Sequence, residues 1–371
     1  MTQDREDFKE IMHAGGNLTI KKRGSKYAID IAGNKPNKVT ITAYRMSIEG
    51  FLFDHNLFVP TDSNYINKFP LRIIILSDEE GYFGRSCPNC KKYFRVKGTP
   101  FIRRCPYCDT KGPSTVFTTI NQRQYIEALY SEYLIVLSKE GDVDHVIDFD
   151  NLIDNLDDNK SPLVYSDQSQ QRIVTCTRCK LVFDIKGHYG ACPDCGKRNC
   201  IQVFHENVSL LEDQFVAAES KMNERNKREN EWKTLINSMV SEFEALGNEL
   251  KRAFDFYPMT PHRRKLFNEL SFQRIEIIFD CFEQWFDINI FRSLKYDDID
   301  FIKRMFQRRH LYTHKNGLVD KDYLTKTNDS TVSEGEYIRP KSKQVKRMMV
   351  LIKQIGDNLF NEFESIDILT D

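Results

Sequence analysis

The chain has 371 residues, of which 40% are hydrophobic, and it carries 54 basic and 54 acidic residues. This length leaves room for two or three domains. No apolar run approaches the roughly 20 residues that span a bilayer, which excludes an integral membrane protein. The N-terminus, MTQDREDFKE, also lacks the apolar segment of a secretion signal. We therefore expect a cytoplasmic protein, in which attraction to nucleic acid would come from local segregation of charge.

Residues 1–80 are predicted to form a small β-rich region. Short runs rich in β-branched residues, separated by Gly, Asn and Pro, are typical of strands. These runs are residues 17–20, 26–31, 38–44 and 71–76. They predict a small sheet that leads into a cysteine-rich segment.

Eight of the ten cysteines form two sets of paired CxxC motifs. The sets are Cys87, Cys90, Cys105 and Cys108, and Cys176, Cys179, Cys192 and Cys195. The two pairs of a set are 14 or 12 residues apart, which is close to the spacing of four-cysteine zinc sites. The sequence therefore predicts two structural zinc ions, held in zinc ribbons at residues 81–115 and 169–206.

Zinc is favoured over other uses of these cysteines. Disulfides are disfavoured in a reducing cytoplasm, and two such similar sites favour zinc over an iron–sulfur cluster. Cys200 follows the second set by five residues, and we interpret it as a surplus thiol, with an exchange into the metal site as the alternative. Cys281 lies in an apolar helical segment and is expected to be a core residue.

The two ribbons are rich in basic residues. In the first, the basic residues are Arg85, Lys91, Lys92, Arg95, Lys97, Arg103, Arg104 and Lys111, against the single acid Asp109. In the second, they are Arg172, Arg178, Lys180, Lys186, Lys197 and Arg198, against Asp184 and Asp194. This imbalance favours a polyanionic partner, and Tyr93, Phe94 and Phe101 suit either base stacking or a small core. The ribbons are thus candidates to dock a nucleic-acid or protein trigger, with a purely structural role as the alternative.

Residues 116–168, between the ribbons, are predicted as a helix followed by an acidic linker. The helix, 121–139, has an apolar stripe. The stripe consists of Tyr125, Ile126, Leu129, Tyr133 and Leu137. Residues 140–158 are acidic, and we interpret them as a solvated linker, with masking of the basic ribbons as the alternative.

After the second ribbon the apolar spacing becomes helical. Residues 207–230 are predicted as a charged connecting helix. Residues 231–371 are predicted as an α-helical bundle. Its helices are expected near 235–250, 264–270, 272–287, 298–314 and 340–363. The expected fold is therefore α+β and multidomain: a β-rich N-terminal region, two zinc ribbons and a C-terminal helical bundle.

Arg309 and His314 form the pair in this bundle that can do chemistry. They end a predicted helix that begins at Asp297-Asp298 and stops at Asn316-Gly317. Imidazole moves protons near neutral pH, and guanidinium matches a phosphate. Cleavage of RNA through its own 2′-hydroxyl needs a base, an acid and a cation, but no metal. The alternative is that these residues have no catalytic role and form a solvent-exposed basic helix end, where positive charge is favoured by the helix dipole.

Helical geometry bears on how this pair would work. Five residues separate Arg309 from His314 by about 7.5 Å along a helix and by well over 90° around it. One copy therefore does not readily close around a phosphate. Two copies of the helix, related by a two-fold axis, would bring two arginines and two histidines together, so the pair predicts a homodimer.

Segment 304–324, RMFQRRHLYTHKNGLVDKDYL, resembles the Rx4-6H helix and following turn of the HEPN superfamily, the higher eukaryote and prokaryote nucleotide-binding domains. The resemblance extends more weakly over 231–371. It implies that Arg309 and His314 are the catalytic pair, that His310 is the polar residue after the arginine, and that the site forms between two protomers. Many bacterial members are ribonucleases, which implies a defence or toxin role. A departure is Lys315, where related sequences often carry Asn.

The leading hypothesis is a metal-independent endoribonuclease that leaves 2′,3′-cyclic phosphate and 5′-hydroxyl ends. Its substrate would be RNA, and its site residues would be Arg309, His314 and His310. The first alternative is a non-catalytic zinc-ribbon protein that binds nucleic acid or regulates, with a bundle that only dimerises. The second is a protein-interaction adaptor. Which RNA would be cut, and what would restrain the activity, do not follow from the sequence.

Overall fold

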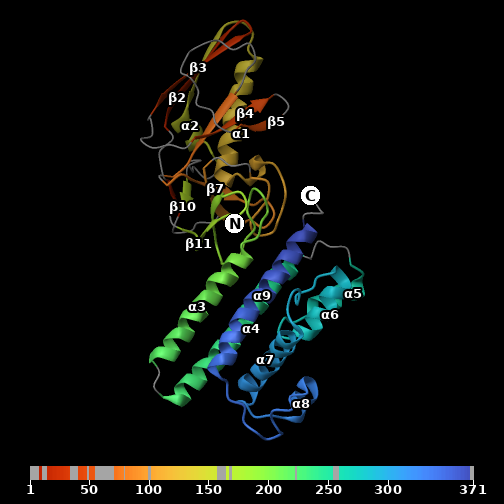
Figure 1. Ribbon diagram of the computed structural model, residues 1–371. Coiled ribbons are helices and arrows are strands. Elements are labelled where there is room, and N and C mark those ends of the chain that lie inside the picture. The colour runs from red at the N-terminus through yellow and green to blue at the C-terminus, as the bar shows by residue number, and fades with distance from the viewer. Residues whose placement is uncertain are drawn as a thin grey trace. The chain divides into compact units, whose positions relative to one another are not determined.

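A computed structural model describes most of the chain. The described residues are 8–10, 15–33, 41–47, 50–54, 71–78, 80–98, 102–156, 164–166, 169–221, 224–253 and 259–367. They form an α+β fold of two compact units, residues 1–199 and 200–371 (Figure 1). The described strands all lie in the first unit and the long helical bundle in the second, as predicted.

A three-stranded antiparallel sheet organises one part of the first unit. Its order is β3 (Lys26–Gly33), β2 (Gly16–Arg23) and β9 (Val143–Asp148). Leu18 and Ile20 alternate with exposed or half-buried neighbours on the central strand and enter the core. This core is completed by helix residues, because α1 (Ile120–Ser138) and α2 (Phe149–Asp154) pack on the sheet. In α1 the buried stripe is Gln122, Tyr125, Ile126, Leu129, Tyr133 and Val136.

The acidic stretch 140–158 is not the predicted linker. Where it is described, it forms strand β9, which pairs with β2, and helix α2. Ile147 and Ile153 are buried, while the acidic side chains lie mostly on the solvent side. Asp148 caps α2 by accepting hydrogen bonds from the next turn. The acidic composition therefore reflects one wet face of ordered elements; residues 157–158 lie outside the described part.

Further strands belong to two smaller sheets. One has the order β5 (Gly50–Asp54), β4 (Ile41–Ser47) and β6 (Leu71–Leu76), and the other pairs β1 (Phe8–Glu10) with β10 (Val164–Ser166). The predicted strands at 17–20, 26–31 and 71–76 are confirmed. The predicted strand at 38–44 overlaps β4, and its residues 38–40 lie outside the described part.

The two predicted ribbons are joined into one module. Their hairpins share a four-stranded sheet of order β11 (Arg172–Thr175), β12 (Val182–Ile185), β8 (Tyr93–Lys97) and β7 (Tyr82–Ser86). Strand β12 of the second ribbon pairs with β8 of the first. One apolar core, to which both ribbons and the short helix η1 (Ser114–Phe117) contribute, lies beneath. We call this unit, residues 77–117 and 169–199, the double ribbon.

A buried ion network crosses the junction of the double ribbon. Arg95 is only 1% exposed, and its Nε donates to Asp184 at 2.9 Å while its Nη1 donates to Asp78 at 3.1 Å. Asp184 also accepts the backbone N–H of Gln170 at 2.8 Å. Burial raises the pKa of Asp78, against the opposing effects of a backbone hydrogen bond from Tyr82 and of the Arg95 charge. Arg95 and the fully buried Arg85 are thus interior residues and do not belong to the predicted basic surface.

The second unit is a helical bundle. Its three long helices, α3 (Cys200–Lys221), α4 (Arg225–Ala253) and α9 (Ser342–Asp367), lie side by side (Figure 1). Helix α7 (Tyr296–His314) packs on α4 and α9. The shorter helices are α5 (Pro261–Glu269), α6 (Ile275–Phe286) and α8 (Lys321–Thr327). Within the described part of the chain, no helix is both long and apolar enough to cross a membrane.

Residues 207–230 do not form a connecting helix. They contain the second part of α3 and the start of α4, and both helices belong to the bundle. The charges of this segment mask a regular apolar stripe, because Val208, Leu211 and Phe215 are buried. The boundary between the units accordingly lies at 199/200, inside the segment 169–206 that was predicted as the second ribbon.

Candidate functional site

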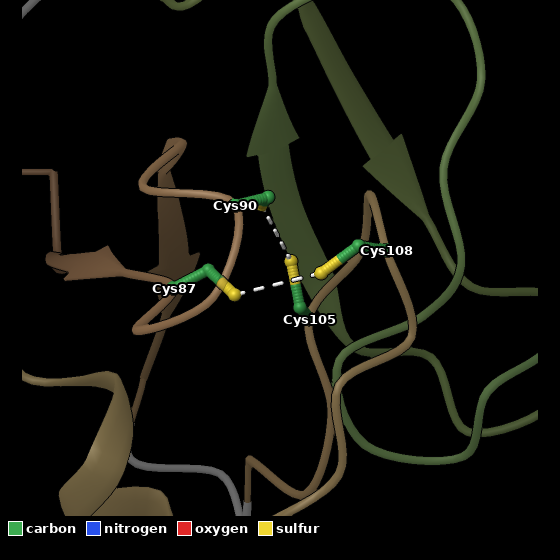
Figure 2. Close-up of side chains that lie close together, drawn as sticks. All are labelled: Cys87, Cys90, Cys105 and Cys108. Carbon is green, nitrogen blue, oxygen red and sulfur yellow. Dashed lines mark hydrogen bonds between the residues drawn. The ribbon is translucent and has the colours of Figure 1, made fainter.

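The first cysteine set forms a compact cluster. Cys87 and Cys90 follow β7, Cys105 and Cys108 lie on a second loop, and the four side chains converge between the two loops (Figure 2). Sulfur–sulfur distances are 3.6 Å for Cys87–Cys108 and 3.7 Å for Cys90–Cys105. Zinc bonds of about 2.3 Å in a tetrahedron would place sulfurs about 3.8 Å apart, so the cluster fits a four-thiolate metal site.

The second set repeats this arrangement. Cys176 lies 3.5 Å from Cys195, and Cys179 lies 3.5 Å from Cys192, measured between sulfurs. In each cluster all four sulfurs are within 4.8 Å of one another, and none of the ten cysteines forms a disulfide. The chain therefore has two four-cysteine groups positioned to bind metal ions, as predicted.

The local backbone explains why these loops converge. Left-handed backbone conformations occur directly after the second cysteine of each pair, at Lys91, Asp109, Lys180 and Gly196. These turns let the chain fold back, so that the second cysteine of each pair faces the same point as the first. Burial raises the pKa of the Cys90 thiol to about 11, so binding of a divalent metal must release its proton.

The remaining cysteines stand apart from both clusters. Cys200 is buried at the first turn of α3 and is not among the grouped ligands, which agrees with a surplus thiol. Cys281 is half-buried on α6. Burial and the charge of Asp280 raise the pKa of its thiol, which disfavours a reactive thiolate.

The double ribbon has a positive surface even when the buried Arg85 and Arg95 are not counted. The exposed basic residues are Lys91, Lys92, Lys97, Arg103, Lys111, Arg178, Lys180 and Lys186. Asp184 forms an ion pair with the buried Arg95, and Asp109 forms one with Arg104. Neither carboxylate is therefore paired with these exposed basic residues. Tyr93 and Phe94 are buried, which contradicts their use in base stacking and assigns them to the core; Phe101 lies outside the described residues.

Arg308 and Arg309 on α7 have opposite environments. Arg308 is 6% exposed, donates to Asp329 at 2.7 Å and to the Tyr323 hydroxyl at 3.0 Å, and is therefore not a solvated helix-end residue. Burial opposes ionisation of Asp329, but hydrogen bonds from Thr331, Tyr323 and Arg308 prevail and hold its pKa well below the usual range. Arg308 is a structural cation.

Arg309, in contrast, is half-buried and is held by a neutral group. Its Nη1 donates to the side-chain oxygen of Gln273 at 2.8 Å, just before α6. Its Nε is buried and has no hydrogen-bond partner, and no carboxylate among the described residues forms an ion pair with it. Arg309 thus keeps a net positive charge at the surface.

His310 and His314 are both exposed, one turn apart, with ring centroids 4.7 Å apart. The pKa of His310 lies below the ordinary value because of partial desolvation and the positive charges of His314, Lys326, Lys315 and Arg309. The lowered pKa favours the neutral imidazole of His310, which can both donate a hydrogen bond and accept a proton.

The predicted helix stop is confirmed. Helix α7 ends at His314, and Asn316 and Gly317 take left-handed conformations. The N–H of Gly317 donates back to Leu311 O at 3.0 Å, and the chain reverses. A side chain at Gly317 would meet Ile338 O at 2.8 Å, so only glycine fits. This reversal leaves the last turn of α7, with its two histidines, open to solvent.

Comparison of the chain with protein-family models, with curated proteins and with solved structures gives no significant match. The HEPN resemblance accordingly rests on segment 304–324 and, more weakly, on residues 231–371. Residues that complete this neighbourhood, above all Gln273, Glu244 and Asp329, were not predicted. Their spacing gives no signal, because Gln273 precedes Arg309 by 36 positions and lies on a different element.

The shared core of the double ribbon predicts that the two metal sites depend on each other. The purified chain should hold two metal ions, and Cys176→Ser should remove one and speed loss of the other to a chelator by about tenfold. Metal content and release can be followed with a colorimetric chelator. Both tryptophans, Trp232 and Trp285, lie in the second unit, so an unchanged fluorescence spectrum shows that the helical bundle keeps its fold, and the far-UV circular dichroism spectrum of the whole chain controls for the first unit. Unchanged release from the first site would contradict this coupling.

The environment of His310 predicts an NMR titration midpoint below about 6.5. His314→Gln removes a neighbouring positive charge, protonation of His310 becomes easier, and its midpoint should rise. Exposed His262 on α5 gives the matched control, because His262→Gln should leave the His310 midpoint unchanged. A wild-type midpoint at or above the ordinary histidine value would show that these charges do not act on His310.

Proposed function

We propose that the chain is a metal-independent endoribonuclease whose site residues are Arg309, His314 and His310. The observation that carries the proposal is the placement of an uncompensated arginine and two exposed histidines at the end of one helix. This surface therefore offers both a cation that can bind an anion and imidazoles that can transfer protons. The resemblance of segment 304–324 to the HEPN helix supports the same residues.

The reaction would be an internal transesterification. One imidazole takes the proton of the 2′-hydroxyl, the 2′-oxygen forms a bond to phosphorus, and the bond from phosphorus to the 5′-oxygen breaks. The leaving 5′-oxygen takes a proton from an acid, which gives a 2′,3′-cyclic phosphate and a 5′-hydroxyl. No water, oxidant or metal enters this balance. His314 acts as base or acid, Arg309 stabilises the phosphate charge, and His310 hydrogen-bonds.

The active form is proposed to be a homodimer formed through the helical bundle. Arg309 contacts Gln273 on one side of α7, while the histidines lie one turn apart on the exposed surface. A second copy of α7 would supply the complementary group to each half. Sedimentation velocity should give two chains per particle, and an active monomer would refute this part of the proposal.

Zinc is the proposed metal of both cysteine clusters, with a structural role. Four thiolates without an open position are typical of structural zinc. The exposed lysines of the double ribbon would dock a nucleic-acid or protein trigger. We further propose a cytoplasmic location and a role in a bacterial defence or toxin system, which the family resemblance suggests.

A non-catalytic nucleic-acid-binding or regulatory protein is the second candidate. The observation that favours it is the positive surface of the double ribbon, which needs no catalysis to bind a polyanion. In this case the bundle would only dimerise. The protein would then bind RNA in a gel-shift assay in a salt-dependent way without cleaving it. Substitution of Arg309 or His314 would leave this binding unchanged.

The main experiment compares wild type and His314→Ala on total RNA in EDTA, with analysis of fragment ends. Wild type should give cyclic phosphate and 5′-hydroxyl ends, and the variant should lose about 100- to 10,000-fold in rate, because a proton-transfer group is gone. His262→Ala, at another exposed histidine of the bundle, should cleave normally. Cysteine-bound metal must be measured in parallel. Equal cleavage by His314→Ala, or an absolute need for magnesium, would refute the proposal.

A further inference from the structure

We propose that Gln273 is a positioning residue that holds Arg309 as an uncompensated cation for an RNA phosphate, and that Glu244 orients Gln273. This inference rests on the proposed function and adds two residues to it. Neither residue touches the reacting atoms; each acts through Arg309.

The hydrogen bonds form a chain with one direction. Glu244, on α4, accepts from Nε2 of Gln273 at 2.7 Å, and Oε1 of Gln273 accepts from Nη1 of Arg309 at 2.8 Å. A carboxylate only accepts and a guanidinium only donates, so the amide can face them in one way only. Glu244 therefore fixes the amide, and the amide fixes one edge of the guanidinium.

Packing holds the middle of this chain in place. Phe272, next to Gln273, is fully buried and meets Phe243 and Phe282 edge-on, with ring centroids 6.1 and 5.6 Å apart. A side chain at Gly247 on α4 would lie 2.2 Å from the Phe272 ring. The bare glycine thus lets the loop before α6 approach α4, and Gln273 is set between α4 and α7.

The neutral amide decides what Arg309 can do. Arg308, its neighbour, is matched by the buried carboxylate of Asp329 and has no charge to offer a ligand. In the chain of hydrogen bonds that holds Arg309, the amide of Gln273 lies between the guanidinium and the carboxylate of Glu244. Its orientation is fixed without neutralisation.

The charge distribution can be reversed without removing the hydrogen bonds. Gln273→Glu places a carboxylate directly on Arg309. The double variant Glu244→Gln/Gln273→Glu keeps the net charge of the network and both hydrogen bonds, but moves the carboxylate from α4 to Arg309. Gln284→Glu, at an exposed position on α6, adds the same charge away from Arg309 and is the matched control.

Two readouts are measured on the full chain. One is kcat/KM for RNA cleavage, and the other is the salt dependence of binding to a 2′-O-methyl RNA, which cannot undergo the reaction. Gln273→Glu and the double variant should each lose about 100-fold in kcat/KM. Their slope of log Kd against log salt should fall by about 0.7 for each phosphate that the variant no longer binds. Gln284→Glu should stay within about twofold of wild type. Fluorescence of Trp232 and Trp285 verifies folding of this unit.

The outcomes separate this inference from the proposed function. Wild-type kcat/KM and salt slope in a folded double variant would overturn the role of the neutral amide, even if RNA cleavage is established. Wild-type binding without cleavage would overturn the nuclease proposal, and the salt slopes would still decide whether Gln273 preserves a phosphate contact. Absence of RNA binding by wild type would overturn both.

Discussion

The buried contact between Arg308 and Asp329 fixes the rotation of α7, and the candidate site depends on that rotation. Arg308 points into the bundle, where Asp329 and Tyr323 satisfy it. Breaking one partner of such a pair costs about 3–5 kcal/mol, so α7 has little freedom to turn. With Arg308 inward, helical geometry carries Arg309 to the edge beside Gln273 and leaves His310 and His314 outward. Two consecutive arginines therefore have a structural and a candidate functional role.

A comparable division applies to the double ribbon. Arg95, which is indistinguishable by sequence from its exposed basic neighbours, is the centre of a buried network with Asp78 and Asp184. Its carboxylates come from both ribbons or their flanks, so the network helps to join them. The remaining lysines form the positive surface. Composition alone overestimates the positive charge of that surface, because it also counts the buried Arg95, whose charge is paired with carboxylates.

Periodicity and spacing predicted much of this molecule. The cysteine spacing gave both metal-site groups, and Asn316-Gly317 gave the end of α7, because tight turns and left-handed stops need particular residues locally. The failures share a physical cause. The described parts of segments 140–158 and 207–230 carry their charges mainly on the solvent side, and which of their positions are buried is seen only with the elements that pack against them. The position of Gln273 beside Arg309 could not be predicted, because it depends on the close packing of the loop before α6 against Gly247 of α4. Composition likewise does not show that β8 and β12 pair.

We propose that Arg309 and His314 exploit the nucleophile that RNA itself carries. The decisive experiment uses a defined RNA in which the ribose at a mapped cleavage position is replaced by 2′-deoxyribose. This RNA is incubated in EDTA with protein whose metal content has been measured. Cleavage at that position should disappear while neighbouring positions are still cut, because the attacking 2′-oxygen is missing. Undiminished cleavage at the deoxy position would contradict it, since the nucleophile would then have to be water or a protein group.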